Sequence, residues 1–181
     1  MAKALFLDRD GIINLDHGYV YQAESFEFMP GIFELCQNAN GAGYQIIIVT
    51  NQSGIARGYY SEEQVNQLHD WMIEQFKSHK VDISKVYFCP HHPEHGGLQY
   101  QHNCLCRKPN PGMLLRANRE LGVDLSQSIM LGDKESDVQA ALKAGIPHRI
   151  LLNSDYINTA DLKHTAATQV VSQLSEIDIA K

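Results

Sequence analysis

Two carboxylates one residue apart end the first apolar segment of the chain. Residues 4–7 are all apolar, and Asp8, Arg9, Asp10 and Gly11 follow them directly. In open α/β sheets ligands bind beyond the carboxyl ends of the strands, so this pair would project into a crevice. Two acids this close repel each other unless a cation or a proton separates them. The pair therefore indicates a Mg²⁺ site or an aspartate nucleophile for a phosphoryl group, although a solvated turn uses the same residue types.

A second apolar run ends in groups that can bind an anion. The β-branched segment 46–49 is followed by Thr50, whose hydroxyl can donate a hydrogen bond to a phosphate oxygen. The turn at Ser53 and Gly54 can aim backbone N–H groups at the same anion. Each of these residues could simply end a strand, so their types alone do not decide between a strand end and an anion site.

Cations and a further carboxylate come later in the chain. Arg107 and Lys108 precede a predicted helix start and would offset developing phosphoryl charge. The apolar run 129–131 ends in Gly132 and Asp133, and Asp137 lies one helical turn further on. A third group of strand-end residues therefore suits a metal ion.

In order along the chain, these segments resemble the four motifs of the haloacid dehalogenase (HAD) superfamily of phosphotransferases. The resemblance covers nearly the whole chain and implies that Asp8 is the nucleophile that forms an aspartyl-phosphate and that Asp10 is the general acid/base. It implies that Thr50 and Lys108 hold the phosphoryl oxygens. It also implies a Mg²⁺ ion bound by Asp8, Asp133 and the backbone carbonyl of Asp10.

The loop over residues 89–106 carries the composition of a zinc site. Cys89 and His91 precede Cys104 and Cys106, and a Cys₃His set gives a tetrahedral zinc site. The glycines and polar residues between them cannot form a core of their own, so a metal would anchor the loop. A His-rich loop with incidental thiols is the alternative. Spacing alone leaves the fourth ligand open among four histidines, since His91 competes with His92, His95 and His102.

Within the superfamily, this loop resembles that of the D,D-heptose 1,7-bisphosphate phosphatases and of the histidinol-phosphatase domains. The segments 50–58 and 107–113 and the long separation between His91 and Cys104 favour the heptose branch. That branch implies a 7-phosphatase of D-glycero-D-manno-heptose 1,7-bisphosphate in nucleotide-activated heptose synthesis for lipopolysaccharide, and it implies His91 as the zinc ligand. It also implies substrate contacts from two loops and two cations, namely Asp16, His17, Gly18, Tyr19, Asn51, Gln52, Ser53, Arg107 and Lys134.

Three alternatives compete with this interpretation. A histidinol phosphatase would use the same mechanism on a different leaving group. A non-catalytic phosphosugar-binding module would fit an Asn at position 8 or 10, whereas both positions hold Asp. A nucleic-acid end-processing phosphatase would need a basic footprint, and the net charge of the chain is −6.

Composition places the chain among soluble proteins. Its 181 residues suit one domain, 1–181, and no apolar run approaches the ~20 residues that span a bilayer. The first strand starts at once and no signal peptide is visible. We therefore expect a cytoplasmic monomer with a small phosphosugar substrate and with neither nucleic acid nor membrane as a partner.

Apolar runs alternate with segments of helical periodicity, which predicts a doubly wound parallel α/β sheet of the HAD-like, Rossmannoid type. Strands are expected near 4–7, 45–49, 85–88, 128–131, 148–152 and 168–171, and helices over 31–40, 61–77, 110–122, 136–144 and 172–177. The intervals 11–49 and 55–107 leave no room for an inserted domain of ~50 residues. The site is therefore expected to be capless and open.

Overall fold

A computed structural model of the chain describes residues 2–153 and 161–179. Its centre is a six-stranded parallel sheet in the order β3-β2-β1-β4-β5-β6. The strands are β1 (Lys3–Leu7), β2 (Tyr44–Asn51), β3 (Ile83–Cys89), β4 (Ile129–Gly132), β5 (His148–Leu152) and β6 (Gln169–Val171). The predicted doubly wound sheet is confirmed, and the strand order reverses between β1 and β4, where such folds bind ligands.

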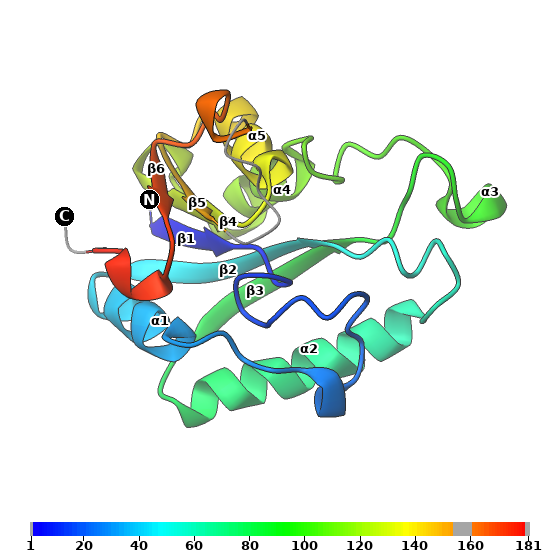
Figure 1. Cartoon of the computed structure of the whole chain (residues 1–181), viewed down its shortest axis with the longest axis horizontal. Helices are drawn as coiled ribbons and strands as arrows, with labels where there is room; N and C mark the ends of the chain where they lie inside the picture. Colours follow the sequence, from blue (N-terminus) through cyan, green and yellow to red (C-terminus); the bar gives the residue numbers. More distant parts are fainter. Residues whose placement is uncertain (1, 154–160, 180–181) are drawn as a thin grey trace.

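Helices cover both faces of this sheet (Figure 1). One face carries α1 (Ile32–Gly41) and α2 (Glu62–Ser78), and the other carries α4 (Gly112–Leu121) and α5 (Glu135–Ala144). Alternate strand residues therefore enter two different cores. Leu5 and Leu7 pack with α1 and α2, whereas Ala4 and Phe6 pack with α4 and α5. This burial on both sides explains why the strands are continuous apolar runs rather than alternating ones.

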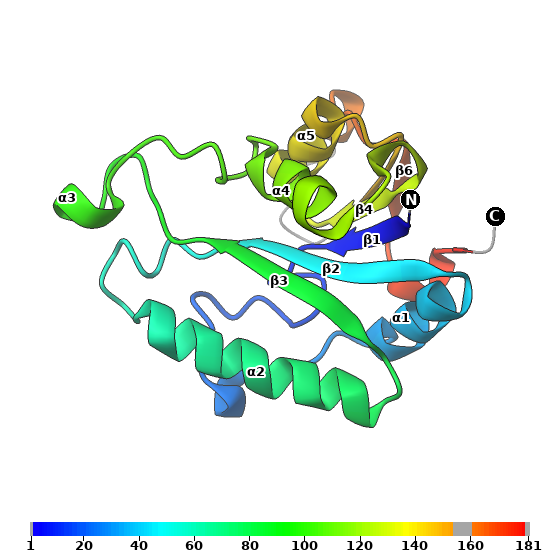
Figure 2. The same ribbon diagram turned by 180° about the vertical axis from the view of Figure 1, so that it is seen from behind.

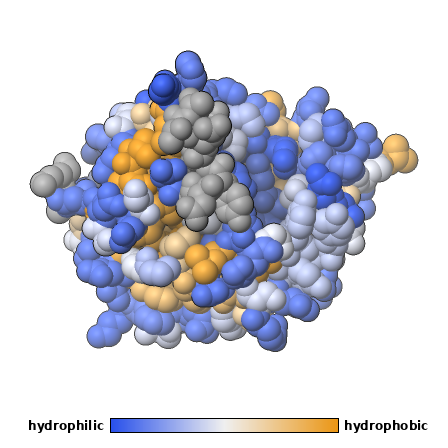
Figure 3. All heavy atoms as spheres, in the orientation of Figure 1, coloured by the Kyte–Doolittle hydropathy of each residue, from blue (hydrophilic) through white to orange (hydrophobic). Residues whose placement is uncertain are grey.

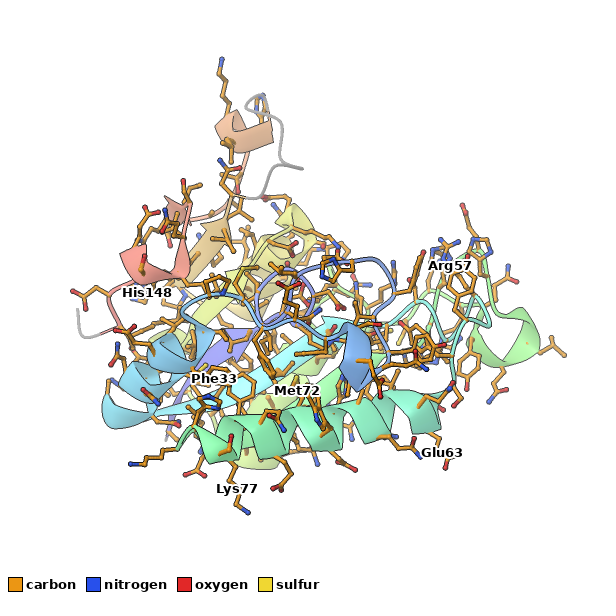
Figure 4. The ribbon with its side chains drawn as sticks, turned by 60° about the horizontal axis from the view of Figure 1, so that its bottom comes forward. Phe33, Arg57, Glu63, Met72, Lys77 and His148 are labelled. Atoms are coloured by element: carbon orange, nitrogen blue, oxygen red, sulfur yellow. The ribbon has the colours of Figure 1, made fainter. Side chains whose placement is uncertain are left out.

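Helix ends follow the capping signals in the sequence. Ser61 and Gln64 form a capping box at the start of α2, whose predicted range was 61–77. Gly122 and Gly145 end α4 and α5 in the left-handed conformation that glycine adopts without strain. Figure 4 shows Met72 of α2 pointing toward the sheet, whereas Glu63 and Lys77 point away from it. The apolar stripe of α2 is thus what fixes the helix to the sheet.

Two parts of the chain differ from the sequence expectation. The segment after β3 contains a short helix, α3 (Gly97–Tyr100), where the sequence predicts only a loop. Figure 2 shows α3 at the tip of this loop, away from the sheet. Residues 172–177 are predicted to be helical but hold only the single 3₁₀ turn η4 (Leu174–Glu176). The remaining 3₁₀ turns are η1 (Ala23–Ser25), η2 (Leu125–Gln127) and η3 (Asp161–Lys163).

The visible surface is mainly hydrophilic, with one apolar area at the upper left and smaller ones elsewhere (Figure 3). Within the described residues, none of the helices combines the length and the apolar character needed to cross a bilayer. Cys36 is fully buried on the apolar face of α1, and burial raises the pKa of its thiol to about 12.

Candidate active site

Three carboxylates meet where β1 and β4 end. Asp8 follows β1, Asp133 follows β4, and Asp137 lies in the first turn of α5. One oxygen from each lies within 4.8 Å of the others, and all three side chains are buried. Because β1 and β4 are paired neighbours, their ends bring residues 125 positions apart into one cluster. The position of each aspartate directly after an apolar run in the sequence therefore predicts that Asp8 and Asp133 lie close together.

Two glycines make room for the cluster. A Cβ atom on Gly11 would lie 2.2 Å from Asp133 Oδ2, and Gly11 has a φ of +90°. A Cβ atom on Gly132 would lie 2.3 Å from the Cβ of Asp137. Any larger residue would therefore push a carboxylate out of place, which is why glycine follows Asp10 and precedes Asp133.

Lys108 provides the buried cation of the site. Its Nζ lies 2.9 Å from Asp8 Oδ1 and 2.6 Å from Asp137 Oδ1, and it donates to the Val49 carbonyl at 2.7 Å. Burial opposes the charged ammonium, but the charges of Asp137 and Asp8 outweigh it, so the pKa of Lys108 is raised. The lysine therefore stays charged and offsets part of the negative cluster.

The cluster still carries more negative charge than Lys108 compensates. Burial, followed by the charge of Asp137, raises the pKa of Asp8 to about 6. Burial, followed by the charge of Asp8, raises the pKa of Asp133 to about 8. Asp133 Oδ1 is buried and has no hydrogen-bond partner among the described groups. Carboxylate oxygens are the ligands that Mg²⁺ prefers, and the positive charge of the ion would compensate this cluster.

Asp10 points to a different set of partners. Its Oδ1 accepts from Arg9 Nη2 at 2.9 Å and from Asn14 Nδ2 at 3.0 Å, and its Oδ2 accepts from Gln52 Nε2 at 3.0 Å. Burial would raise the pKa of Asp10, but Arg9 and these amide donors lower it overall. Its side chain is thus separate from the three-acid cluster while its backbone remains next to Asp8.

The amide residues after β2 hold other parts of the site. Asn51 makes two hydrogen bonds with the backbone of Lys108, one from its Nδ2 to the carbonyl and one to its Oδ1 from the N–H, each 3.0 Å long. Gln52 also donates to Thr50 Oγ1 at 2.9 Å and accepts from the hydroxyl of Tyr60. Asn51 and Gln52, expected to contact substrate, therefore have side-chain partners within the protein.

An open cavity of about 370 Å³ lies over these groups. It is lined by most of the predicted catalytic and substrate residues, namely Asp8, Asp10, Asn51, Ser53, Arg107, Lys108 and Lys134, together with Pro109, Ser136 and Asp137.

The loop after β1 contributes less directly to this cavity. Asp16 Oδ2 lies 3.8 Å from Lys134 Nζ, and the N–H of Gly18 donates to Asp16 Oδ1. His17 contacts Glu27 at 3.1 Å, and Tyr19 packs edge-on against Tyr59. Asp16 thus reaches a cavity residue, whereas His17, Gly18 and Tyr19 are not among the cavity-lining residues.

A second ligand cluster lies beside the cavity. Cys89, His91, Cys104 and Cys106 bring one ligand atom each to within 4.8 Å of one another. His91 Nδ1 is 3.7 Å from Cys89 Sγ and 3.8 Å from Cys106 Sγ. Tetrahedral zinc with bonds of about 2.3 Å to sulfur and 2.0 Å to nitrogen separates such atoms by about 3.6 Å. The other three candidate histidines are not part of this cluster. The ring of His102 packs beside His91, and that of His92 packs beside His95.

Several residues of the site, or their contacts, were not predicted from the sequence. Arg9 is buried and donates to Asp10, buried His69 contacts Arg9, and Asn14 also donates to Asp10. The sequence indicates Asp137 only as a possible metal ligand, yet it pairs with Lys108. The only signal for Arg9 was its place between two acids, and none marked His69 within the polar and apolar pattern of α2.

Comparisons with known proteins agree with this geometry. A family model described as HAD-hydrolase-like matches residues 105–177. The D-glycero-beta-D-manno-heptose-1,7-bisphosphate 7-phosphatase of Yersinia pestis is 44% identical over 96% of this chain and 92% of its own. The D-glycero-alpha-D-manno-heptose-1,7-bisphosphate 7-phosphatase of Burkholderia mallei is 50% identical over 93% and 88% of the two chains.

A solved structure gives the same result. The D,D-heptose 1,7-bisphosphate phosphatase of B. bronchiseptica, complexed with magnesium and phosphate, is 30% identical with a TM-score of 0.81, covering 96% of this chain and 94% of its own. Because it is 44% and 50% identical to the Yersinia pestis and Burkholderia mallei relatives over nearly its full length, this chain belongs to the heptose-1,7-bisphosphate 7-phosphatase family of HAD-like hydrolases.

Proposed function

We propose that this protein removes the 7-phosphate of D-glycero-D-manno-heptose 1,7-bisphosphate through a phosphoaspartate on Asp8, within nucleotide-activated heptose synthesis. The observation that carries the proposal is the position of Asp8. Its carboxylate lines the open cavity and lies 2.9 Å from Lys108 Nζ, in a chain that matches named 7-phosphatases over nearly its full length. Both the α- and the β-anomer phosphatases are among these relatives, so either anomer is a candidate substrate.

The first half of the reaction uses the two aspartates in different roles. Asp8 Oδ attacks phosphorus, and the bond from phosphorus to the sugar oxygen breaks. Asp10, on the separate hydrogen-bond network, gives its proton to the leaving alkoxide. Lys108, which lines the cavity, would offset the charge that develops on the transferring phosphoryl oxygens. Thr50 does not line the cavity in this structure, and its hydroxyl accepts from Gln52, so its predicted contact with the phosphoryl group would require this hydroxyl to turn toward the cavity.

The second half regenerates Asp8. Asp10, now a carboxylate, takes a proton from a water molecule that attacks the phosphoaspartate. The donors that surround Asp10 favour this charged form. The open cavity admits the water that this step requires.

The three-acid cluster suits a divalent cation. Asp8, Asp133 and the backbone carbonyl of Asp10 would hold Mg²⁺, which offsets negative charge on the phosphoryl group when bound. The buried Asp133 Oδ1 without a partner supports this assignment. The Cys₃His cluster supports a separate structural zinc, since thiolates prefer the softer metal.

Replacing the nucleophile should remove turnover and leave the fold intact. In Asp8→Asn an amide replaces the carboxylate, and an amide is a poor nucleophile and a weaker Mg²⁺ ligand, so kcat should fall by several orders of magnitude. Asp10→Asn should cost roughly 10²–10⁴-fold because it removes the acid/base but spares the backbone carbonyl. Phosphate release with circular dichroism measures both effects. Asp70→Asn, on the exposed face of α2, is the matched control, and a folded Asp8→Asn enzyme at near wild-type rate would refute the assignment.

The contribution of Asp133 to metal-free stability should fall as pH rises from about 4 to about 8. Burial and the charge of Asp8 raise the pKa of Asp133 from 3.8 to about 8, so in this window the folded state binds a proton that the unfolded state has lost. This contribution therefore decreases with increasing pH. Asp133→Asn should flatten this dependence, raise the melting temperature in a chelator at pH 8, and abolish much of the stabilisation by added Mg²⁺. Thermal unfolding across pH tests this, and a lower metal-free melting temperature for the variant at pH 8 would contradict it.

One zinc per chain should copurify with the protein, whereas Mg²⁺ should exchange freely. Cys106→Ala should lose the zinc and lower activity, although Cys106 touches no substrate, because its loop leads directly into Arg107 and Lys108. Cys36→Ala, remote from the loop, should keep the metal. Elemental analysis of protein purified without added metal measures this. Absence of any soft metal from the wild type would refute the closed site.

Heptose 1,7-bisphosphate should exceed histidinol phosphate in kcat/KM by at least about tenfold, or ~1.4 kcal/mol. Arg107 lines the cavity, donates from Nη1 to the His91 carbonyl at 3.3 Å and makes no ion pair with a described residue, so its charge is available to a distal anionic group. It would repel the cationic amine of histidinol phosphate.

Arg107→Ala should reduce this preference more than it slows hydrolysis of a small phosphate ester. Arg116→Ala, which removes an exposed pair with Glu120 on α4, is the matched control and should leave the preference unchanged. Steady-state kinetics on the three substrates separates the cases. A wild-type preference for histidinol phosphate would overturn the heptose assignment and leave the phosphatase mechanism standing.

A further inference from the structure

A fully buried arginine joins the general acid to two other parts of the fold. Arg9 Nη2 donates to both oxygens of Asp10, at 2.9 and 3.1 Å, and to the carbonyl of Val20 at 2.6 Å. Arg9 Nη1 lies 3.1 Å from His69 Nε2. Val20 belongs to the loop after β1, and His69 belongs to α2 and is 60 residues away in sequence. The guanidinium is therefore the junction of β1, the loop and the helix.

The contact between Arg9 and His69 fixes the state of the histidine. A guanidinium has five N–H donors and no acceptor, so His69 Nε2 must be the acceptor. The ring is then neutral and carries its proton on Nδ1. Burial, followed by the charge of Arg9, lowers the pKa of His69 to about 3, which agrees with a neutral ring. A buried neutral histidine with this fixed tautomer acts as a directional acceptor for one guanidinium nitrogen.

Removing that acceptor would re-aim the guanidinium. Nη1 would become an unpaired donor inside the protein, and such a donor costs free energy unless it finds a new partner. The planar fork moves as one body, so a shift at Nη1 also moves Nη2 relative to Asp10 and Val20. Asn14 and Gln52 would still hold the Asp10 carboxylate, so it would be misdirected rather than released.

We propose that His69 is a positioning residue which, through Arg9, sets the direction in which the Asp10 carboxyl meets the leaving oxygen. The inference rests on the proposed role of Asp10 as the general acid. It concerns the step in which Asp8 Oδ bonds to phosphorus, the phosphorus–oxygen bond to the leaving group breaks, and the proton of Asp10 passes to the leaving oxygen. A misdirected Asp10 slows this step only where the leaving oxygen needs that proton.

The choice of leaving group separates this role from a packing role. An alkoxide needs the proton, whereas 4-nitrophenolate is a stable anion that leaves without it. In single-turnover experiments with excess enzyme, His69→Leu should consume a simple alkyl phosphate at least about tenfold more slowly than wild type. It should release 4-nitrophenol from 4-nitrophenyl phosphate at a rate within about twofold of wild type. His69→Gln, whose amide oxygen can accept from Arg9, should recover most of the alkyl phosphate rate.

Met72→Ala is the packing control. Met72 is fully buried on α2, less than one turn beyond His69, and Figure 4 shows its side chain pointing toward the sheet. It should lower the melting temperature and leave the ratio of the two rates unchanged. His69→Met serves if His69→Leu does not fold, because its flexible thioether fills the space and accepts hydrogen bonds only weakly.

The outcomes distinguish this inference from the proposed function. Equal slowing of both substrates by His69→Leu, or no slowing of either, would overturn the role of His69. Failure of His69→Gln to recover the alkyl phosphate rate would also overturn it. Asp10→Asn is the reference: if that variant shows no dependence on the leaving group, the assignment of Asp10 itself fails. The probes are simple esters, so neither result depends on the heptose assignment.

Discussion

The buried ammonium of Lys108 is the interaction on which the site depends. Burying three carboxylates within 4.8 Å of one another is costly, and Lys108 offsets two of them directly, at 2.9 Å from Asp8 and 2.6 Å from Asp137. The third, Asp133, keeps an oxygen without a partner and a pKa raised to about 8 by burial and by Asp8. The site is therefore built to be completed by further positive charge, and a phosphoryl group would then approach a nucleophile with compensated charge.

Lys108 needs external support because it lies outside regular secondary structure, between the loop of α3 and the start of α4. Two devices provide that support. The side chain of Asn51 pairs with the backbone N–H and carbonyl of Lys108, much as a neighbouring strand would. Two residues earlier, Cys106 belongs to the Cys₃His cluster, which also includes Cys89 at the end of β3, so a metal bound there would fasten the loop to the sheet. The strand at the edge of the sheet and the loop that carries the cation thus meet at the same place.

The sequence was sufficient to predict the fold and the residues that lie together at the strand ends. Apolar runs predicted the strands, helical periodicity predicted α2 close to its observed bounds, and parallel pairing brings Asp8 and Asp133 together without further information. Contacts that depend on tertiary packing could not be predicted from the sequence. Arg9 is a residue type that is seldom fully buried, and His69 lies in an amphipathic helix where a buried histidine resembles any core position. The partners of the Asn51 and Gln52 amides likewise depend on which loops happen to face them.

The environment of Asp10 shows how one carboxyl can act first as an acid and then as a base. In the free site, Arg9, Asn14 and Gln52 all donate to it and lower its pKa, which favours the carboxylate. A bound phosphate ester brings negative charge close to this carboxylate, and a like charge raises the pKa. The proton is therefore most stable on Asp10 while the ester is bound, when the leaving oxygen needs it. Once the sugar has left and the phosphoryl group is bonded to Asp8, that negative charge is reduced, and the same donors favour the base that activates water.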